Sequence, residues 1–168
     1  MIEDKSYGEI LLQARQKAGE IREFFKTLKT TPEETIYPVL KEVHQEVFEK
    51  TDCLACAACC KHIPPILTEQ DISRLARRVG ISRKKFVRQY VLTDLNGEMT
   101  MNGVPCRFLG PDNACQVYKD RPEACRRYPH TDEKAYPKRL ELNLANTQVC
   151  PAAYNIAIRL MELLNCIK

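Results

Sequence analysis

The feature that most limits how this chain can fold is its cysteine content. Its 168 residues include nine cysteines, and four of them lie in one short segment, Cys53-Leu-Ala-Cys56-Ala-Ala-Cys59-Cys60. An odd number of cysteines cannot all form disulfides within one chain. In a C-x-x-C step, two thiolates can converge on one ion while the intervening backbone amides hydrogen-bond to the sulfurs. The segment therefore predicts metal ligation or redox chemistry.

Composition and the first residues indicate the compartment. No stretch approaches the roughly 18 consecutive apolar residues that a membrane-spanning helix requires. The chain begins MIEDKSYGEI, with two acids among its first four residues and no apolar segment, so we expect no secretory signal. We expect a cytoplasmic protein that does not enter a membrane, in a compartment where thiols stay reduced. The net charge of +4 is too small to indicate a nucleic-acid partner by itself.

Apolar residues at spacings of three and four predict helices at both ends of the chain. One such stripe covers residues 10–28 and a second covers 36–47, which together predict an N-terminal helical hairpin. A third stripe, after Cys150-Pro151, predicts a final helix. Between them, Thr68 to Asp71 resembles a capping box at the start of a helix, and Ser82 is a candidate cap for a second helix.

The remaining segments predict short strands and turns. Asn96-Gly97 and Asn102-Gly103 favour tight turns, and residues 110–113 predict a turn between the runs 104–109 and 115–118. Residues 140–144 alternate leucine with polar residues, which predicts a half-buried strand.

These elements predict a helix-rich α+β fold. We expect the N-terminal helical hairpin, residues 1–50, to pack on a cysteine-cluster metal-binding domain, residues 51–168, in one compact unit. The hairpin and the C-terminal helix would enclose a small, irregular core that is built around cysteines and short β-hairpins.

Eight of the nine cysteines are candidate metal ligands, enough for two four-thiolate sites or one larger centre. Side chains of adjacent residues diverge, so Cys59 and Cys60 are expected to serve different centres or to bridge a polynuclear one. Cys166 follows the apolar stripe of the last helix and is expected to bind nothing. Four thiolates suit either tetrahedral zinc or an iron–sulfur cluster, and the spacing leaves both open. The predicted ligands are Cys53, Cys56, Cys59, Cys60, Cys106, Cys115, Cys125 and Cys150.

Four further motifs follow the 53–60 cluster in order: Cys106-Arg-Phe-Leu109, Cys115-Gln-Val-Tyr118, Arg121-Pro122 and Cys125-Arg126-Arg127-Tyr128-Pro129. Together they resemble the CxxCxxCC cysteine-cluster family, also called YkgJ-like proteins, from about Cys53 to Cys150. The resemblance implies a zinc- or iron-chelating domain in which the matching cysteines hold the metal. Members usually have glycine inside the cluster, where this chain has Ala57 and Ala58. Flagellin lysine-N-methylase is similar in its cysteine pattern, so the resemblance allows an enzymatic role without establishing one.

Two groups of basic residues are candidates for a functional role. Arg121, Arg126 and Arg127 crowd Cys125 and would either offset thiolate charge or pair with Asp120 or Glu123. A longer run has no acid between Ile72 and Thr93; an anionic protein or a nucleic acid could bind it, although a solvated face is the default. That run consists of Arg74, Arg77, Arg78, Arg83, Lys84, Lys85 and Arg88.

The leading hypothesis is a cytosolic metal-chelating protein that binds zinc or an iron–sulfur cluster through the eight cysteines. One alternative is an enzyme of redox or methyl-transfer chemistry that the metal centre supports. The chain has no phosphate loop, nucleophile elbow or dinucleotide fingerprint, so catalytic residues stay unknown. A zinc-stabilised interaction module that uses the basic run is the other alternative.

Overall fold

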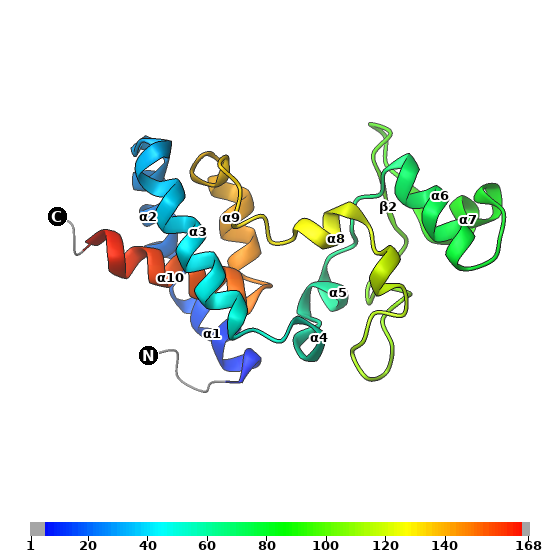
Figure 1. Cartoon of the computed structure of the whole chain (residues 1–168), viewed down its shortest axis with the longest axis horizontal. Helices are drawn as coiled ribbons and strands as arrows, with labels where there is room; N and C mark the ends of the chain where they lie inside the picture. The colour runs from blue at the N-terminus through cyan, green and yellow to red at the C-terminus, as the bar shows by residue number, and fades with distance from the viewer. Residues whose placement is uncertain (1–5, 166–168) are drawn as a thin grey trace. The chain divides into compact units, whose positions relative to one another are not determined.

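The computed structural model describes residues 6–165, and within them the chain forms two compact units (Figure 1). The helical unit combines Met1–Asp52 with Pro129–Lys168, and the cysteine unit is Cys53–Tyr128. Helices dominate and one small antiparallel sheet is present, which confirms the helix-rich α+β class. No described helix has both the length and the apolar character needed to cross a membrane.

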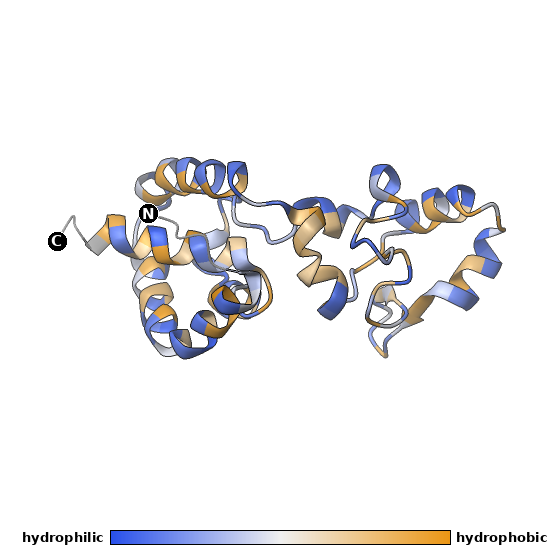
Figure 2. Ribbon diagram, turned by 90° about the horizontal axis from the view of Figure 1, so that it is seen from below, coloured by the Kyte–Doolittle hydropathy of each residue, from blue (hydrophilic) through white to orange (hydrophobic). Residues whose placement is uncertain are grey.

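The helical unit is built from amphipathic helices that share one apolar core. Phe25 of α2 and Leu40 of α3 are buried in that core, and Phe25 meets the ring of Tyr136 edge to face. Figure 2 shows how hydrophobic and hydrophilic residues alternate along these helices. The described elements are α1 (Tyr7–Gln16), α2 (Ala18–Thr30), α3 (Glu33–Glu49), the 3-10 turn η2 (Tyr136–Lys138), α9 (Leu140–Thr147) and α10 (Pro151–Asn165).

The first and last described helices, α1 and α10, pack together in this unit. The first predicted arm of the hairpin is divided at Lys17 into α1 and α2, so three helices stand where two were expected. The final helix, α10, packs on α1, α3 and α9. The C-terminal helix thus groups with the N-terminal helices, whereas the sequence interpretation placed it with the cysteine segment.

The predicted strand at residues 140–144 is wrong, because this segment is helix α9. Leu142 is exposed, whereas Asn143, Leu144 and Asn146 are buried, a pattern that follows a helix. Asn143 Nδ2 donates to the carbonyl oxygen of Tyr136 at 2.6 Å, which fixes the helix against the preceding turn. Five residues are too few to distinguish the two-residue period of a strand from the 3.6-residue period of a helix, and here tertiary contacts favour the helix.

The cysteine unit consists of short elements with a small apolar core of its own. Ile72 and Leu75 of α6, Phe86 of α7 and Met101 of β2 are buried in it, and the rings of Phe86 and Phe108 are parallel. The elements are α4 (Cys53–Cys56), α5 (Ala58–His62), α6 (Glu69–Arg78), α7 (Arg83–Tyr90), β1 (Val91–Thr93), β2 (Met99–Met101), η1 (Tyr118–Asp120) and α8 (Glu123–Arg127).

Local signals place most of these elements. Thr68 and Asp71 form the predicted capping box of α6, and the Ser82 hydroxyl accepts the Lys85 N–H at the start of α7. β1 pairs antiparallel with β2, with Val91 opposite Met101. The connecting turn includes Gly97 at a φ of +84°, a left-handed conformation that favours glycine.

Ala57 joins α4 to α5 in a left-handed conformation, with a φ of +48°. This conformation costs a residue with a Cβ about 1–2 kcal/mol, which glycine avoids. Ala57 is also buried, and losing its methyl group costs about 0.8 kcal/mol. The neighbouring Ala58 is similarly buried but is the first residue of α5. Glycine at this position would lose the buried methyl group and lower the helix propensity, with no strained conformation to relieve.

We therefore expect Ala57→Gly to leave the free energy of unfolding unchanged or to raise it by up to about 1 kcal/mol. Ala58→Gly, the matched control, should lower it by about 1–2 kcal/mol through lost burial and lower helix propensity. Urea unfolding followed by circular dichroism measures both. Equal destabilisation by the two substitutions would contradict the strained turn at Ala57.

Candidate metal centre

The first four cysteines lie on two short helices that meet at Ala57. Cys53 and Cys56 are one helical turn apart in α4; Cys53 is exposed and Cys56 is partly buried. Cys59 and Cys60 are adjacent in α5, and both are partly buried. The turn at residues 110–113 is tied to α4, because Asn113 Nδ2 donates to the carbonyl oxygen of Ala55 at 3.1 Å.

Cys106 and Cys115 lie on the two arms of a short hairpin. Leu109 and Cys115 form an antiparallel bridge, and the predicted turn between them is present. The Cys106 N–H donates to the carbonyl oxygen of Cys60 at 2.7 Å, which joins this hairpin to α5. Each cysteine opens a tight turn, since the N–H of Leu109 donates to the Cys106 carbonyl and that of Tyr118 to the Cys115 carbonyl.

Backbone amides also point at these two sulfurs. The Cys106 thiol accepts from the N–H groups of Phe108 and Leu109, and the Cys115 thiol accepts from that of Val117. Such N–H···S hydrogen bonds stabilise a thiolate and are the usual outer contacts of cysteine ligands. The turns therefore place and tune both sulfurs through the backbone alone.

Cys60, Cys106, Cys115 and Cys125 are close enough for their thiols to interact electrostatically, and we refer to them as the four-thiol group. Cys125 reaches the group from α8. Burial and then the charges of the other three raise the pKa of the Cys125 thiol to about 12. Burial likewise raises the pKa of the Cys106 and Cys115 thiols.

Cys60 is the exception within this group. A hydrogen bond from the Cys59 thiol, opposed by burial and assisted by Lys61, lowers the pKa of Cys60 to about 7. Arg121 is the cation that acts on the others, because its charge lowers the pKa of both Cys115 and Cys125. The group thus holds one readily ionised thiol beside three that favour the neutral form.

The donor set fits a soft metal, since four cysteine sulfurs satisfy either tetrahedral zinc or an iron–sulfur cluster. In the described part of the chain, no three His, Cys, Asp or Glu side chains already stand in the arrangement of a metal site. Ligation therefore requires the four sulfurs, all of which are partly buried, to come closer to one another.

Residues 52–151 match the model of a family described as "CxxCxxCC: Putative zinc- or iron-chelating domain". The chain belongs to this CxxCxxCC family. A curated relative, "Uncharacterized protein MJ0661" of Methanocaldococcus jannaschii, is 30% identical over 82 residues, which are 47% of this chain and 44% of that protein. The match thus spans less than half of the relative's length. No solved structure was found to match.

The CxxCxxCC match ends just beyond Cys150, which lies in the helical unit. Cys150 directly precedes α10, packs against the core of that unit, and its sulfur accepts the N–H of Ala153 at 3.4 Å. Its role as a ligand stays a prediction. Cys166, expected to bind nothing, lies outside the described residues.

The sequence interpretation counted Cys60 with the 53–60 cluster and expected it to serve a different centre from Cys59 or to bridge a polynuclear one. In the structure, Cys60 accepts a hydrogen bond from the Cys59 thiol and lies within electrostatic reach of Cys106, Cys115 and Cys125. The sequence could not reveal the partners of Cys60.

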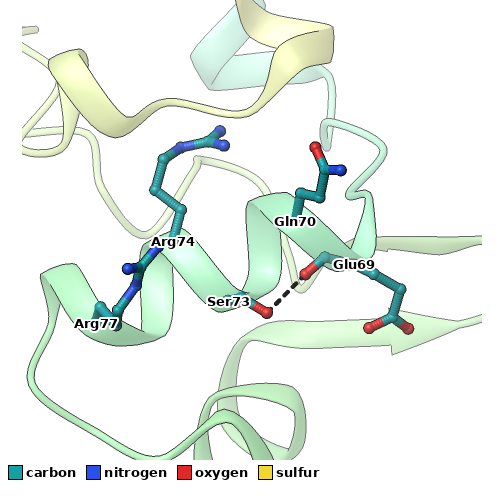
Figure 3. Close-up of a pocket in the computed structure, with 5 residues that line it drawn as sticks. All are labelled: Glu69, Gln70, Ser73, Arg74 and Arg77. Carbon is teal, nitrogen blue, oxygen red and sulfur yellow. Dashed lines mark hydrogen bonds between the residues drawn. The ribbon is translucent and has the colours of Figure 1, made fainter.

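Much of the basic run is engaged within the CxxCxxCC segment. Arg78 pairs with Asp120 at 3.4 Å, Arg83 pairs with Glu69, and Arg74 pairs with Asp71. A pocket of about 380 Å³ on α6 is lined by Glu69, Gln70, Ser73, Arg74 and Arg77 (Figure 3). The mixed charge of the pocket and the ion pairs leave no specific support for an anionic partner.

The Cys59–Cys60 contact makes a prediction about ionisation. Cys59→Ala removes the donor, so the pKa of Cys60 should rise from about 7 toward the ordinary cysteine value of about 8.5. Cys59→Ser is the control, because its hydroxyl can still donate. The pH dependence of Cys60 alkylation in metal-free protein, followed by peptide mass spectrometry, gives the midpoint. Identical midpoints in wild type and Cys59→Ala would show that the hydrogen bond does not set this pKa.

Proposed function

We propose that the protein binds zinc or an iron–sulfur cluster through cysteine thiolates, with the four-thiol group as its principal centre. The observation that carries the proposal is the convergence of Cys60, Cys106, Cys115 and Cys125 from three separate segments of the cysteine unit. Membership of the CxxCxxCC family supports the chelation of zinc or iron.

Electrostatics support this assignment. Four thiolates around a divalent ion leave a net charge of about −2, which nearby cations must balance. Arg121 acts on two of the thiols, and the cysteine unit as a whole has thirteen Lys and Arg against seven Asp and Glu. The excess of positive charge therefore lies in the unit that would carry the thiolates.

We assign the remaining predicted ligands to a second metal-binding group. Cys53 and Cys56 share one face of a helical turn, and Cys59 follows after the left-handed residue Ala57. Such a turn can bring C-x-x-C-x-x-C sulfurs to one ion. Cys150 stays a candidate ligand on its spacing alone.

Metal analysis of anaerobically purified protein tests the proposal directly. We expect near-stoichiometric zinc in a colourless protein, or iron and sulfide in a brown one. Cys125→Ser and Cys106→Ser should each abolish at least one equivalent of bound metal, because a closed four-ligand site loses affinity steeply with one ligand. Cys166→Ser, the control, should change nothing. Purified protein without zinc or iron, or full metal content in Cys125→Ser, would overturn the proposal.

The same measurement locates the second group. Cys53→Ser should lower the metal content while leaving the spectrum of the centre that depends on Cys125 unchanged. An unchanged metal content in Cys53→Ser would restrict the protein to the four-thiol group.

Metal affinity should rise steeply with pH. The pKa values of Cys106, Cys115 and Cys125 are raised, so these thiols carry protons at neutral pH and each proton must leave before the metal binds. Binding should therefore release about three protons per centre near pH 8. Folded-state stabilisation by metal is correspondingly lost as the pH falls. Calorimetry of zinc binding in two buffers of different ionisation enthalpy measures the release, and binding without proton release would contradict this assignment.

A further inference from the structure

The backbone between Cys115 and Cys125 is held by arginine side chains. Arg121 Nη1 donates to the carbonyl oxygen of Tyr118 at 2.7 Å, and the Arg121 guanidinium stacks 3.9 Å from the centre of the Tyr118 ring. Arg126 donates to the carbonyl oxygens of Lys119 and Arg121, the latter at 3.2 Å. Both arginines belong to the segment that they fix, where Arg126 of α8 joins that helix to η1.

Arg74 makes that attachment from α6. Its Nε donates to the carbonyl oxygen of Asp120 at 3.1 Å, and its Nη2 donates to that of Arg121 at 3.0 Å. Figure 3 shows the Arg74 side chain leaving α6 toward the neighbouring segment, whereas Ser73 bonds back to its own helix at the Glu69 carbonyl. A planar guanidinium can serve several acceptors at once, which an ammonium group cannot do with the same geometry.

Asp71 holds Arg74 in place and also reaches α8. Its carboxylate accepts from Arg74 Nη2 and, at 3.1 Å, from the N–H of Glu123, the first residue of α8. The same carboxylate accepts from Thr68 in the capping box. Only 2% of the Asp71 side chain is exposed, so these four donors satisfy a charge that water does not reach.

Besides the Glu123 contact, α8 is tied to η1 by Arg126, which donates to the carbonyl oxygen of Lys119. None of its five residues is buried, so an apolar core does not fix the helix that carries Cys125. α6, by contrast, has Ile72 and Leu75 fully buried in the core of the cysteine unit. The polar face of α6 therefore supplies rigidity that α8 lacks.

We propose that Arg74 and Asp71 are positioning residues for the metal ligands: they attach residues 118–123 to α6 and so place Cys125 within the four-thiol group. The inference rests on the proposed function and extends it. It identifies two side chains that do not bind the metal but hold a ligand-bearing segment distant from them in the sequence. Neither residue touches a sulfur in the described contacts; each acts through the backbone on either side of η1 and α8.

Arg74→Lys tests the inference, with Arg77→Lys on the exposed side of the same helix as the matched control. We expect cobalt(II) to bind Arg74→Lys at least about tenfold more weakly, as is typical when an outer contact of a metal site is lost. The thiolate-to-cobalt absorption should lose the contribution of about one of the four thiolates. Arg77→Lys should bind cobalt(II) as the wild type does.

Alkylation of the metal-free protein separates positioning from general support of the fold. Cys106 is joined to α5 through the Cys60 carbonyl, whereas Arg74 bonds to the carbonyls of Asp120 and Arg121 beside Cys125. In Arg74→Lys, the alkylation rate of Cys125 should therefore rise severalfold while that of Cys106 stays at its wild-type value. An equal rise at both cysteines, or no difference between Arg74→Lys and Arg77→Lys, would overturn the inference.

A second variant covers the case in which Arg74→Lys does not fold. Relative to Glu123→Ala, which lacks the same carboxylate, Glu123→Pro also removes the N–H that Asp71 accepts, and proline is well suited to the first position of a helix. Compared with Glu123→Ala, it should show the same selective increase in Cys125 alkylation and weaker cobalt(II) binding. If it matches Glu123→Ala in both, Asp71 does not position α8.

Cys125→Ser, measured in parallel, distinguishes this inference from the proposed function. Wild-type cobalt(II) affinity in Cys125→Ser would remove Cys125 from the ligands and overturn the proposed centre. The alkylation comparison does not depend on metal, so it would still decide whether Arg74 and Asp71 hold Cys125 in place.

Discussion

Four cysteine thiols converge within the cysteine unit, and the surrounding structure depends on how their charge is managed. Burial and mutual repulsion raise the pKa of Cys125 to about 12, so the group disfavours four thiolates in the absence of a compensating positive charge. The N–H groups that point at Cys106 and Cys115, and the charge of Arg121, compensate in part. Neutral thiols or a bound cation are the two states that satisfy this constraint, which is the behaviour expected of a metal-ligand set.

Polar backbone contacts act together with apolar packing to arrange the segments that carry these thiols, because Phe108 and Val117 place the Cys106–Cys115 hairpin in the apolar core. α4 and α8 contain no buried residue, and the apolar core of the cysteine unit centres on α6, α7 and the small sheet. The Cys106–Cys60 backbone hydrogen bond joins the hairpin to α5, and Arg74 with Asp71 joins the 118–123 segment to α6. A small apolar core can thus hold Cys106 and Cys115 by packing, while satisfied polar groups tie the segment that carries Cys125 to it.

The elements that the sequence predicted correctly are those with local signals. The capping box at Thr68 and Asp71, the cap at Ser82 and the turn at Gly97 each depend on residues within four positions of one another. The strand prediction at 140–144 was wrong because an alternation of five residues is weak evidence for a strand. The tertiary contacts that bury Asn143 and Asn146 favour a helix there. The division at Lys17 was missed because the apolar stripe continues across it.

The sequence alone determined the supply of ligands, their spacing and their family pattern, because these are properties of residue order. Only the tertiary structure showed that Cys60 lies within electrostatic reach of Cys106, Cys115 and Cys125, which come from distant segments of the chain. It also revealed two contacts between distant segments. Arg74, which the sequence presented as part of a basic run, bonds to the backbone of Arg121, 47 positions away. Asp71, which the sequence presented as a helix cap, bonds to the backbone of Glu123, 52 positions away. Helix caps and turns are set by neighbours along the chain, whereas such pairings depend on how the folded backbone brings distant segments together.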